Sequence, residues 1–177
     1  ASATAEDGDK VSADRHMDVH LPERLPDATT LDAWADEVVA ELVGLLDAPR
    51  GQPYSGPVLL RGKAAAVFFH EVMGHRLEGH RQKREREGKT FKEYVGRPIL
   101  PEFIDVVDDP TLAHAAGHDL NGFYRYDDEG VAAQQVQLVD DGVLLGFLMG
   151  RSPIQGFEHS NGHGRRQPGY DPVTRQG

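Results

Sequence analysis

Two histidines flank a glutamate at residues 70–75, where the sequence reads HEVMGH after an apolar run at residues 64–69. Neutral imidazoles are common zinc ligands, and a carboxylate beside a ligand can take a proton from metal-bound water. These residue types are those that a zinc hydrolase needs, with His70 and His75 as ligands and Glu71 as general base. Ordinary polar positions on a partly buried helix are the weaker interpretation, because the glutamate lies inside the histidine spacing.

The spacing of the two histidines differs from the common H-E-x-x-H pattern, which places both ligands on one face of an α-helix. Here the second histidine follows the first by five residues. On a regular α-helix this leaves the two rings roughly 140° apart around the axis. They can meet one ion only if the helix is widened or broken between them. A π-bulge would have this effect, and Gly74 tolerates such a distortion.

The stretch resembles the H-E-x-x-x-H signature of the TldD/PmbA family of zinc metallopeptidases, also called modulators of DNA gyrase. Further segments match in the same order: YSGPVLL at residues 54–60, LEGHRQ at 77–82, VDDPT at 107–111, YDDEGV at 126–131 and GHGRR at 162–166. Together the matching segments cover roughly residues 54 to 177. The resemblance implies zinc (Zn²⁺) as cofactor and Glu71 as the base that activates water.

The third zinc ligand has no obvious candidate. A catalytic zinc normally takes three protein ligands and a water, and the resemblance implies a cysteine far downstream as the third. This sequence has no cysteine and stops where the family is in mid-domain, so the chain looks like a fragment. Glu78 and His80 are the nearest substitutes, and Asp127, Asp128 or Glu129 could arrive from the sheet. We favour a supporting role for Glu78, orienting a ligand histidine, and a structural turn for the two aspartates.

Charge and hydropathy exclude several classes of partner. The net charge of −10 at pH 7 argues against direct contact with nucleic acid or with an anionic membrane surface. No apolar run approaches the length that crosses a bilayer, and the first residues show no signal-peptide pattern. We therefore expect a cytoplasmic protein. Without cysteines, this chain forms no disulfides and has no thiol chemistry.

The chain as a whole predicts an α+β fold, with helices near the front and an antiparallel β-sheet behind them. Residues 1–28, rich in Ala, Asp, Ser and Pro, predict a flexible linker or arm before an incomplete metallopeptidase domain at 29–177. An amphipathic helix is expected after an N-cap at Thr29, with apolar residues at helical spacing up to Leu46. The histidine motif is expected on an active-site helix from residue 64 to near 79.

Short strands and one clear hairpin make up the predicted sheet. The hairpin joins strands at residues 136–139 and 143–149 through an Asp-Gly turn. Other strands are expected at 58–60, 103–107 and 122–126. A densely charged stretch at 81–87 has both signs and predicts a solvated face.

The C-terminal stretch, residues 152–177, is rich in Gly, Pro, His and Arg. Metal binding by His159 and His163 is possible, but a flexible polar loop is the simpler interpretation. If the family pattern holds, residues 162–166 lie near the substrate cleft. Arg165 and Arg166 could then hold a carboxylate or a backbone acceptor of a peptide.

The residues and the resemblance together predict a zinc metallopeptidase that hydrolyses bonds in a peptide or unfolded protein substrate. The resemblance also implies a homo- or hetero-oligomer in which a motif-bearing subunit, like this chain, assembles with a paralogous subunit that lacks the motif. The alternative is a non-catalytic metal-binding or scaffolding module without the third ligand. A reading frame that continues past Gly177 to a suitable cysteine would favour the enzyme.

Overall fold

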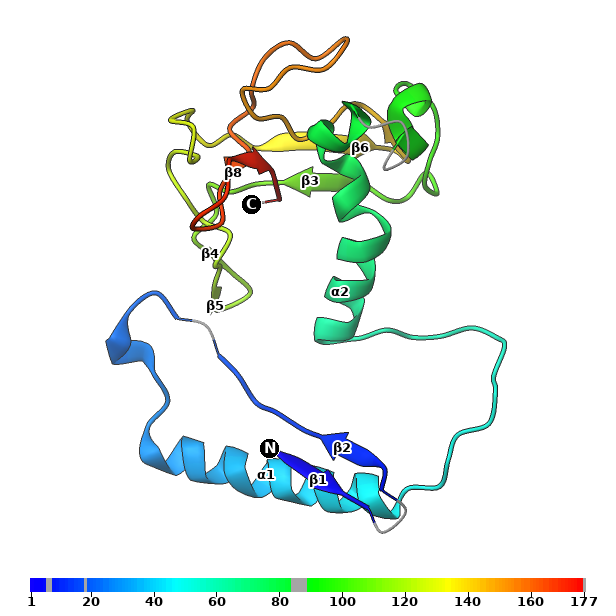
Figure 1. Cartoon of the computed structure of the whole chain (residues 1–177), viewed down its shortest axis with the longest axis vertical. Helices are drawn as coiled ribbons and strands as arrows, with labels where there is room; N and C mark the ends of the chain where they lie inside the picture. The colour runs from blue at the N-terminus through cyan, green and yellow to red at the C-terminus, as the bar shows by residue number, and fades with distance from the viewer. Residues whose placement is uncertain (6–7, 18, 84–88, 177) are drawn as a thin grey trace. The chain divides into compact units, whose positions relative to one another are not determined.

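The structure is a computed structural model that describes residues 1–5, 8–17, 19–83 and 89–176 (Figure 1). The chain divides into two compact units, Ala1–Val58 and Leu59–Gly177, and each is described by itself. This division differs from the domain boundary expected at residue 28. Whether residues 1–28 act as a flexible arm stays a prediction, although the structure places a hairpin within them.

The first unit consists of a short antiparallel hairpin and one long helix. Its elements are β1 (Ser2–Thr4), β2 (Lys10–Ser12), the 3-10 helix η1 (Pro22–Arg24) and α1 (Ala28–Asp47). The α1 helix starts after Asp27, whose carboxylate accepts a hydrogen bond from the Thr30 N–H at 2.8 Å. The expected cap at Thr29 is therefore wrong, because the preceding aspartate supplies the capping oxygen.

The apolar side chains of α1 are mostly exposed. Leu42 is the one buried residue of this helix, whereas Leu31, Val39 and Val43 are each more than half exposed. Arg15 forms ion pairs with Glu37 and Glu41 on the exposed face, at 3.1 and 2.8 Å. A helix is thus present where the spacing predicts one, but its apolar stripe is largely uncovered.

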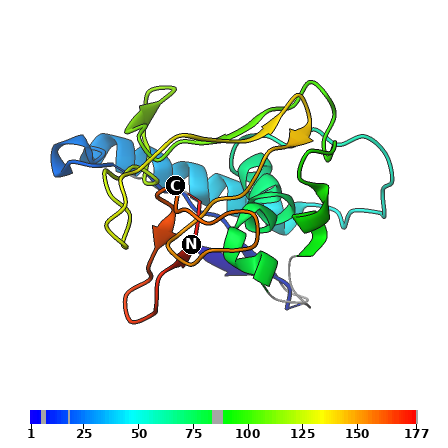
Figure 2. The same cartoon turned by 90° about the horizontal axis from the view of Figure 1, so that it is seen from above.

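The second unit is built on a three-stranded antiparallel sheet in the order β3–β6–β7. Its strands are β3 (Val106–Asp108), β6 (Val136–Asp140) and β7 (Val143–Leu144). The segment that contains β3 runs alongside β6 in the two views (Figure 1, Figure 2). Two further strand pairs complete the unit: β4 (His114–Ala115) with β5 (His118–Asp119), and β8 (Gly164–Arg165) with β9 (Val173–Thr174).

The β6–β7 hairpin forms at the predicted Asp-Gly turn. Asp141 and Gly142 both have positive φ, 46° and 75°, which matches the right-handed twist of a two-residue hairpin. The hairpin prediction is confirmed, although β7 is shorter than the expected strand at residues 143–149.

Three other strand predictions differ from the structure. Residues 58–60 form no strand, and Val58 and Leu59 are exposed. Residues 122–126 contribute only an isolated bridge between Tyr126 and Ala132. The strand expected at 103–107 starts at Val106 instead. Short apolar runs are ambiguous because pairing partners, which the local sequence does not contain, decide whether a strand forms.

The motif helix is also shorter than predicted. Helix α2 spans Gly62–Val72 and is followed by tight 3-10 turns, η2 (Gly74–Leu77), η3 (Gly79–Lys83) and η4 (Lys89–Tyr94). The helix is therefore broken between the two histidines, not widened by a π-bulge. Of the charged stretch at 81–87, residues 84–87 lie outside the described residues. No helix in the described part of the chain is long and apolar enough to cross a membrane.

The core of the second unit lies where the turns after α2 pack on the sheet. Its largest fully buried apolar side chains are Leu77, Leu138, Leu144, Leu148 and Met149. Two backbone hydrogen bonds of 2.9 Å fix the turn to the chain at Leu148, one from the Gly79 N–H and one to the carbonyl of Leu77. A Cβ at Gly79 would collide with the Met149 sulfur and the Leu148 carbonyl. This close approach places Glu78 inside the protein.

Candidate metal centre

The end of α2 brings His70, Glu71 and His75 together. One possible ligand atom from each residue lies within 4.8 Å of the other two. The two imidazole rings are 4.3 Å apart between centroids, at an angle of 68°. Met73, with φ −115° and ψ −50°, departs from ideal helix geometry and caps α2. This break in the helix allows histidines five residues apart to approach each other.

The three residues differ in exposure. His70 and Glu71 lie on the surface, and the Glu71 side chain is 63% exposed. His75 is half-buried, and its Nε2 lies 4.0 Å from a Glu71 carboxylate oxygen. In the described chain the group is therefore open to solvent, which a catalytic centre requires and a closed structural site does not.

Glu78 is the buried acid behind His75, and its side chain is fully inaccessible to solvent. Its carboxylate lies 3.0 Å from His75 Nδ1 and accepts hydrogen bonds from Arg81 at 2.6 Å and from Arg175 at 3.0 and 3.3 Å. Gln176 donates a further hydrogen bond at 3.3 Å. Burial alone would raise the pKa of Glu78, but the hydrogen bonds from Arg81, His75 and Arg175 outweigh burial and hold that pKa below its usual value.

This arrangement orients the His75 ring. An ionised Glu78 only accepts, so His75 Nδ1 carries a proton, and in the neutral ring Nε2 then keeps the lone pair on the side of Glu71. A carboxylate behind a ligand histidine is a common support of metal sites. The residues present therefore fit a metal ion on the Nε2 side. The Glu78 oxygens face four donors within the protein, which agrees with the supporting role that we favoured.

His80 is not part of the group formed by His70, Glu71 and His75. Its Nε2 lies 4.0 Å from a Glu78 oxygen, and its side chain lines a separate cavity of about 230 Å³ with Glu129 and Ser152. The structure thus does not bring this proposed substitute ligand to the two histidines of the motif.

A larger cavity, of about 450 Å³, adjoins His70. It is lined mainly by apolar side chains of α2, η2, β3 and β6, together with Asp108 and Gln176. Buried His163 holds Asp108 at 3.0 Å through Nε2, while its Nδ1 faces the backbone and side-chain oxygens of Asn161 at 2.9 and 3.1 Å. The interpretation of His163 as part of a flexible polar loop is therefore wrong, because three acceptors fix a fully buried ring.

Asp127 and Asp128 have structural contacts. One oxygen of Asp127 accepts the backbone N–H groups of Glu129 and Val131 at 3.0 and 2.8 Å, and the other accepts that of Gly164 at 2.9 Å. These bonds join the turn to β8, as the predicted structural role requires. Asp128 accepts from the Arg165 side chain at 3.3 Å.

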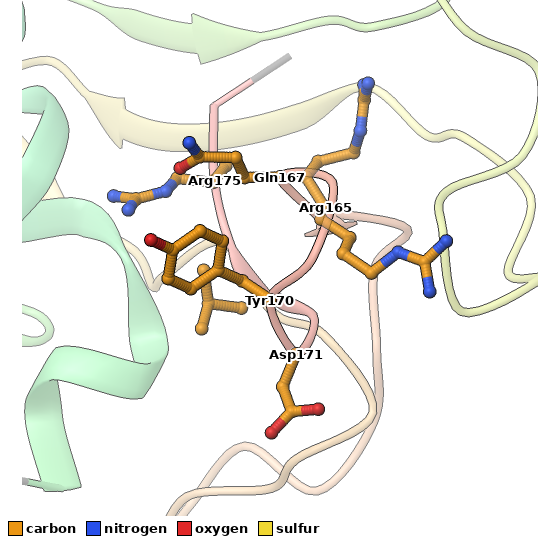
Figure 3. A pocket seen from close by; sticks show the side chains of 7 residues that line it. Arg165, Gln167, Tyr170, Asp171 and Arg175 are labelled. Atoms are coloured by element: carbon orange, nitrogen blue, oxygen red, sulfur yellow. The ribbon is translucent and has the colours of Figure 1, made fainter.

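Arg165 and Arg166 line a third cavity, which β8, β9 and the loop between them form (Figure 3). Arg175, from the end of β9, lines the same cavity and also contacts Glu78. Among these arginines, only Arg175 contacts the motif region, through Glu78, whereas Arg165 and Arg166 contact Asp128.

Sequence reasoning missed four residues of this neighbourhood. Arg175 and Gln176 lie almost a hundred positions after Glu78, and nothing in the local sequence pairs them with it. Asp108 was noted only as part of the matching segment at residues 107–111, with no role in the site. Arg81, three residues after Glu78, was recognisable because oppositely charged residues at this spacing are neighbours on a helical turn.

Comparison with known proteins identifies the family of this chain. Residues 53–177 match the family described as the PmbA/TldA metallopeptidase C-terminal domain. The chain belongs to this PmbA/TldD family. The resemblance inferred from the motif and the segments that follow it is thus confirmed over most of the chain.

Curated relatives carry metalloprotease names. A metalloprotease of Archaeoglobus fulgidus is 33% identical over 78% of this chain and 30% of its own length. The metalloprotease TldD homolog of Haemophilus influenzae is 29% identical over 76% of this chain and 27% of its own length. The zinc metalloprotease TldD homolog of Saccharolobus solfataricus is 30% identical over 54% of this chain and 20% of its own length. The chain thus spans about 30% or less of each of these relatives.

A solved structure of TldE from Thermococcus kodakarensis shows the same fold. It superposes with a TM-score of 0.54 at 20% identity, covering 82% of this chain and 31% of TldE. At this identity the likeness concerns the fold alone. It agrees with the predicted α+β class of this PmbA/TldD chain.

Proposed function

We propose that this chain carries the metal-binding half of a zinc-dependent peptidase centre, with His70 and His75 as ligands and Glu71 as general base. The observation that carries the proposal is the approach of these three side chains to within 4.8 Å at an exposed surface. Support comes from the metalloprotease names of the relatives, one of which is named a zinc enzyme.

Each residue of the chain has a defined task in this proposal. His70 and His75 present neutral nitrogens, and Glu78 keeps His75 in the tautomer whose Nε2 is free to bind. Glu71 takes a proton from water at its carboxylate and can return it to the departing amine. Zinc bound there would lower the pKa of water and polarise the scissile carbonyl. The apolar cavity beside His70 would receive a side chain of the peptide.

A third ligand must come from outside the motif. The chain has no cysteine, and among the described residues the group around His70 contains only the two imidazoles and one carboxylate. The second candidate function is a non-catalytic metal-binding or scaffolding module, which needs no third ligand. In either case the proposal includes assembly with a paralogous subunit, as the family resemblance implies.

The first test is the zinc content of the purified chain and of a His70→Ala variant, measured by mass spectrometry after equilibration with zinc and dialysis. We expect one zinc per chain in the wild type and none in the variant. His159→Ala is the matched control, because His159 is exposed and outside the group. The proposed centre would be contradicted if His159→Ala loses its zinc while His70→Ala keeps it.

The general base is tested separately from the ligands. Glu71→Gln should bind zinc as the wild type does, but it should hydrolyse peptides about 10²- to 10⁴-fold more slowly. Peptide hydrolysis is followed by release of a quenched fluorophore. A wild-type chain that binds zinc and cleaves no peptide would support the non-catalytic module.

A further inference from the structure

The cavity of about 450 Å³ beside the metal centre has mostly apolar walls. His70, one of the proposed ligands, lines it, and so do the apolar residues Ala66, Phe69, Leu77 and Leu138. Its volume lies in the range of pockets that hold small organic groups. A peptide side chain in this cavity would therefore lie next to the proposed metal ligand and would be surrounded mainly by carbon atoms.

Two other polar side chains line the cavity, Asp108 at the end of β3 and Gln176 just after β9. Gln176 Nε2 donates to Glu78 at 3.3 Å, so Oε1 is the amide atom that remains to accept a hydrogen bond. Gly74 leaves room for this amide, because a Cβ at that position would lie 3.0 to 3.3 Å from three of its atoms. Both polar side chains thus contribute hydrogen-bond acceptors.

The Asp108 carboxylate is held in place by His163. The His163 side chain is fully buried, and its Nε2 lies 3.0 Å from Asp108 Oδ1. An ionised carboxylate accepts several hydrogen bonds through its two oxygens, so this contact does not exhaust Asp108 as an acceptor. The Asp108 side chain also keeps 11% of its surface exposed. A donor that enters the cavity can therefore be added to the contacts that Asp108 already has.

The charge around the cavity favours a cationic group. No lysine or arginine is among the described residues that line it, and the chain has a net charge of −10. Lysine and arginine side chains place an aliphatic stem against apolar surface and a charged group on polar partners. Such a side chain matches both the walls and the acceptors. An acidic side chain would be repelled by Asp108, and an aliphatic one would leave the acceptors without a donor.

We infer that this cavity is a subsite for a lysine or arginine side chain of the peptide substrate. The apolar walls enclose the stem, and Asp108 accepts hydrogen bonds from the ammonium or guanidinium group, with Gln176 Oε1 as a second acceptor. The inference rests on the proposed peptidase function, to which it adds a preference for basic residues. Because His70 lines the same cavity, the basic residue would lie close to the bond that is cleaved. His163 acts as a positioning residue for Asp108.

The test measures binding to the metal-free chain by fluorescence anisotropy, so that it depends neither on zinc nor on catalysis. The probes are labelled alanine peptides, acetylated and amidated, with lysine, norleucine or glutamate at the central position. Norleucine has the stem of lysine without the ammonium group. We expect lysine to bind roughly 3- to 10-fold more tightly than norleucine, and glutamate to bind most weakly. Salt should reduce the lysine preference between about 50 mM and about 500 mM NaCl, since it screens accessible charges.

Asp108→Asn should abolish the preference for lysine and leave norleucine binding within about twofold of wild type, because the apolar walls stay the same. Glu102→Gln is the matched control, since it removes an exposed carboxylate outside the cavity. It should keep the preference. Circular dichroism checks that each variant folds.

A second pair of variants tests the cavity without changing the contact between Asp108 and His163. Ala66→Leu fills part of the space from the exposed surface of α2 and should weaken the binding of lysine and norleucine peptides alike. Ala64→Leu, on the same helix but outside the cavity, should bind as wild type does. The inference is overturned if lysine and norleucine peptides bind wild type equally, if a folded Asp108→Asn keeps the preference, or if Ala66→Leu binds both peptides as wild type does. Absence of zinc or of hydrolysis would count against the proposed function only.

Discussion

The two halves of the histidine motif are held by different parts of the protein. His70 and Glu71 lie on α2, a helix with no buried residue, where Phe68 is 57% exposed. His75 lies in the turns that follow, between Met73 and Leu77 of the core, and its ring contacts fully buried Glu78. The positions of His70 and Glu71 therefore depend on the helix alone, and the position of His75 depends on the core.

This contrast shows how one short motif can combine an accessible reaction site with a rigid support. As the proposed base, Glu71 would have to meet water and substrate, and it gains from exposure. As a proposed ligand, His75 would have to keep its geometry, and it gains from a buried carboxylate that orients it. We therefore expect substitutions in the first half to affect metal chemistry alone. Substitutions in the second half should also affect stability.

The largest effect is expected from the two glutamates. Glu78→Gln removes the charge that compensates Arg81 and Arg175, and leaving a buried network without one partner costs about 3 kcal/mol. Glu71→Gln should change the free energy of unfolding by less than about 0.5 kcal/mol, because its carboxylate is exposed. Urea unfolding followed by circular dichroism measures both. Equal losses of stability would remove the distinction between the two halves.

The histidines provide a second, smaller comparison. His75→Ala removes a hydrogen bond to a buried carboxylate and should destabilise the chain by about 2 kcal/mol. His70→Ala should stay within about 0.5 kcal/mol of wild type, since it is exposed. Both variants should lose zinc. Thermal unfolding of the metal-free proteins separates stability from metal binding. A larger loss of thermal stability for His70→Ala than for His75→Ala would show that His70 on α2 contributes more to folding than His75 does.

Sequence patterns among neighbouring residues predicted the features of the structure that neighbouring residues determine. The Asp141-Gly142 turn dictates the β6–β7 hairpin, because both residues adopt positive φ readily. The His-Glu-His spacing required a distortion after His70, and the structure has one, although as a broken helix. The family match and the α+β class also followed from motifs along the chain.

Features that depend on distant partners were not predictable from one sequence. Glu78 is buried because Arg175 and Gln176 return to it from the end of the chain, and no spacing rule joins such positions. His163 was taken as flexible because it lies among glycines, yet Asp108 and Asn161 hold its ring. In both cases a polar residue is buried by contacts that only the tertiary fold creates.

The pH dependence of stability gives the smallest expected effect and the sharpest check on Glu78. Burial tends to raise the pKa of this carboxyl, but hydrogen bonds from Arg81, His75 and Arg175 outweigh it, so the pKa is below the ordinary value of 4.5. Between the lower folded pKa and this ordinary value, the Glu78 carboxyl is protonated in the unfolded chain and still ionised in the folded chain. The contribution of Glu78 is therefore complete above pH 4.5 and is lost as pH falls through the lower folded pKa.

Other carboxylates titrate in the same window, so the difference between variants is the informative quantity. Urea midpoints from about pH 7 down to about pH 3 should fall more steeply for wild type and Glu71→Gln than for Glu78→Gln, which has no charge at this position to lose. Parallel curves for all three proteins would mean that the guanidinium groups of Arg81 and Arg175 do not stabilise the ionised form. In that case His75 would be held by packing against Met73 and Leu77, and its tautomer would no longer be fixed by a carboxylate.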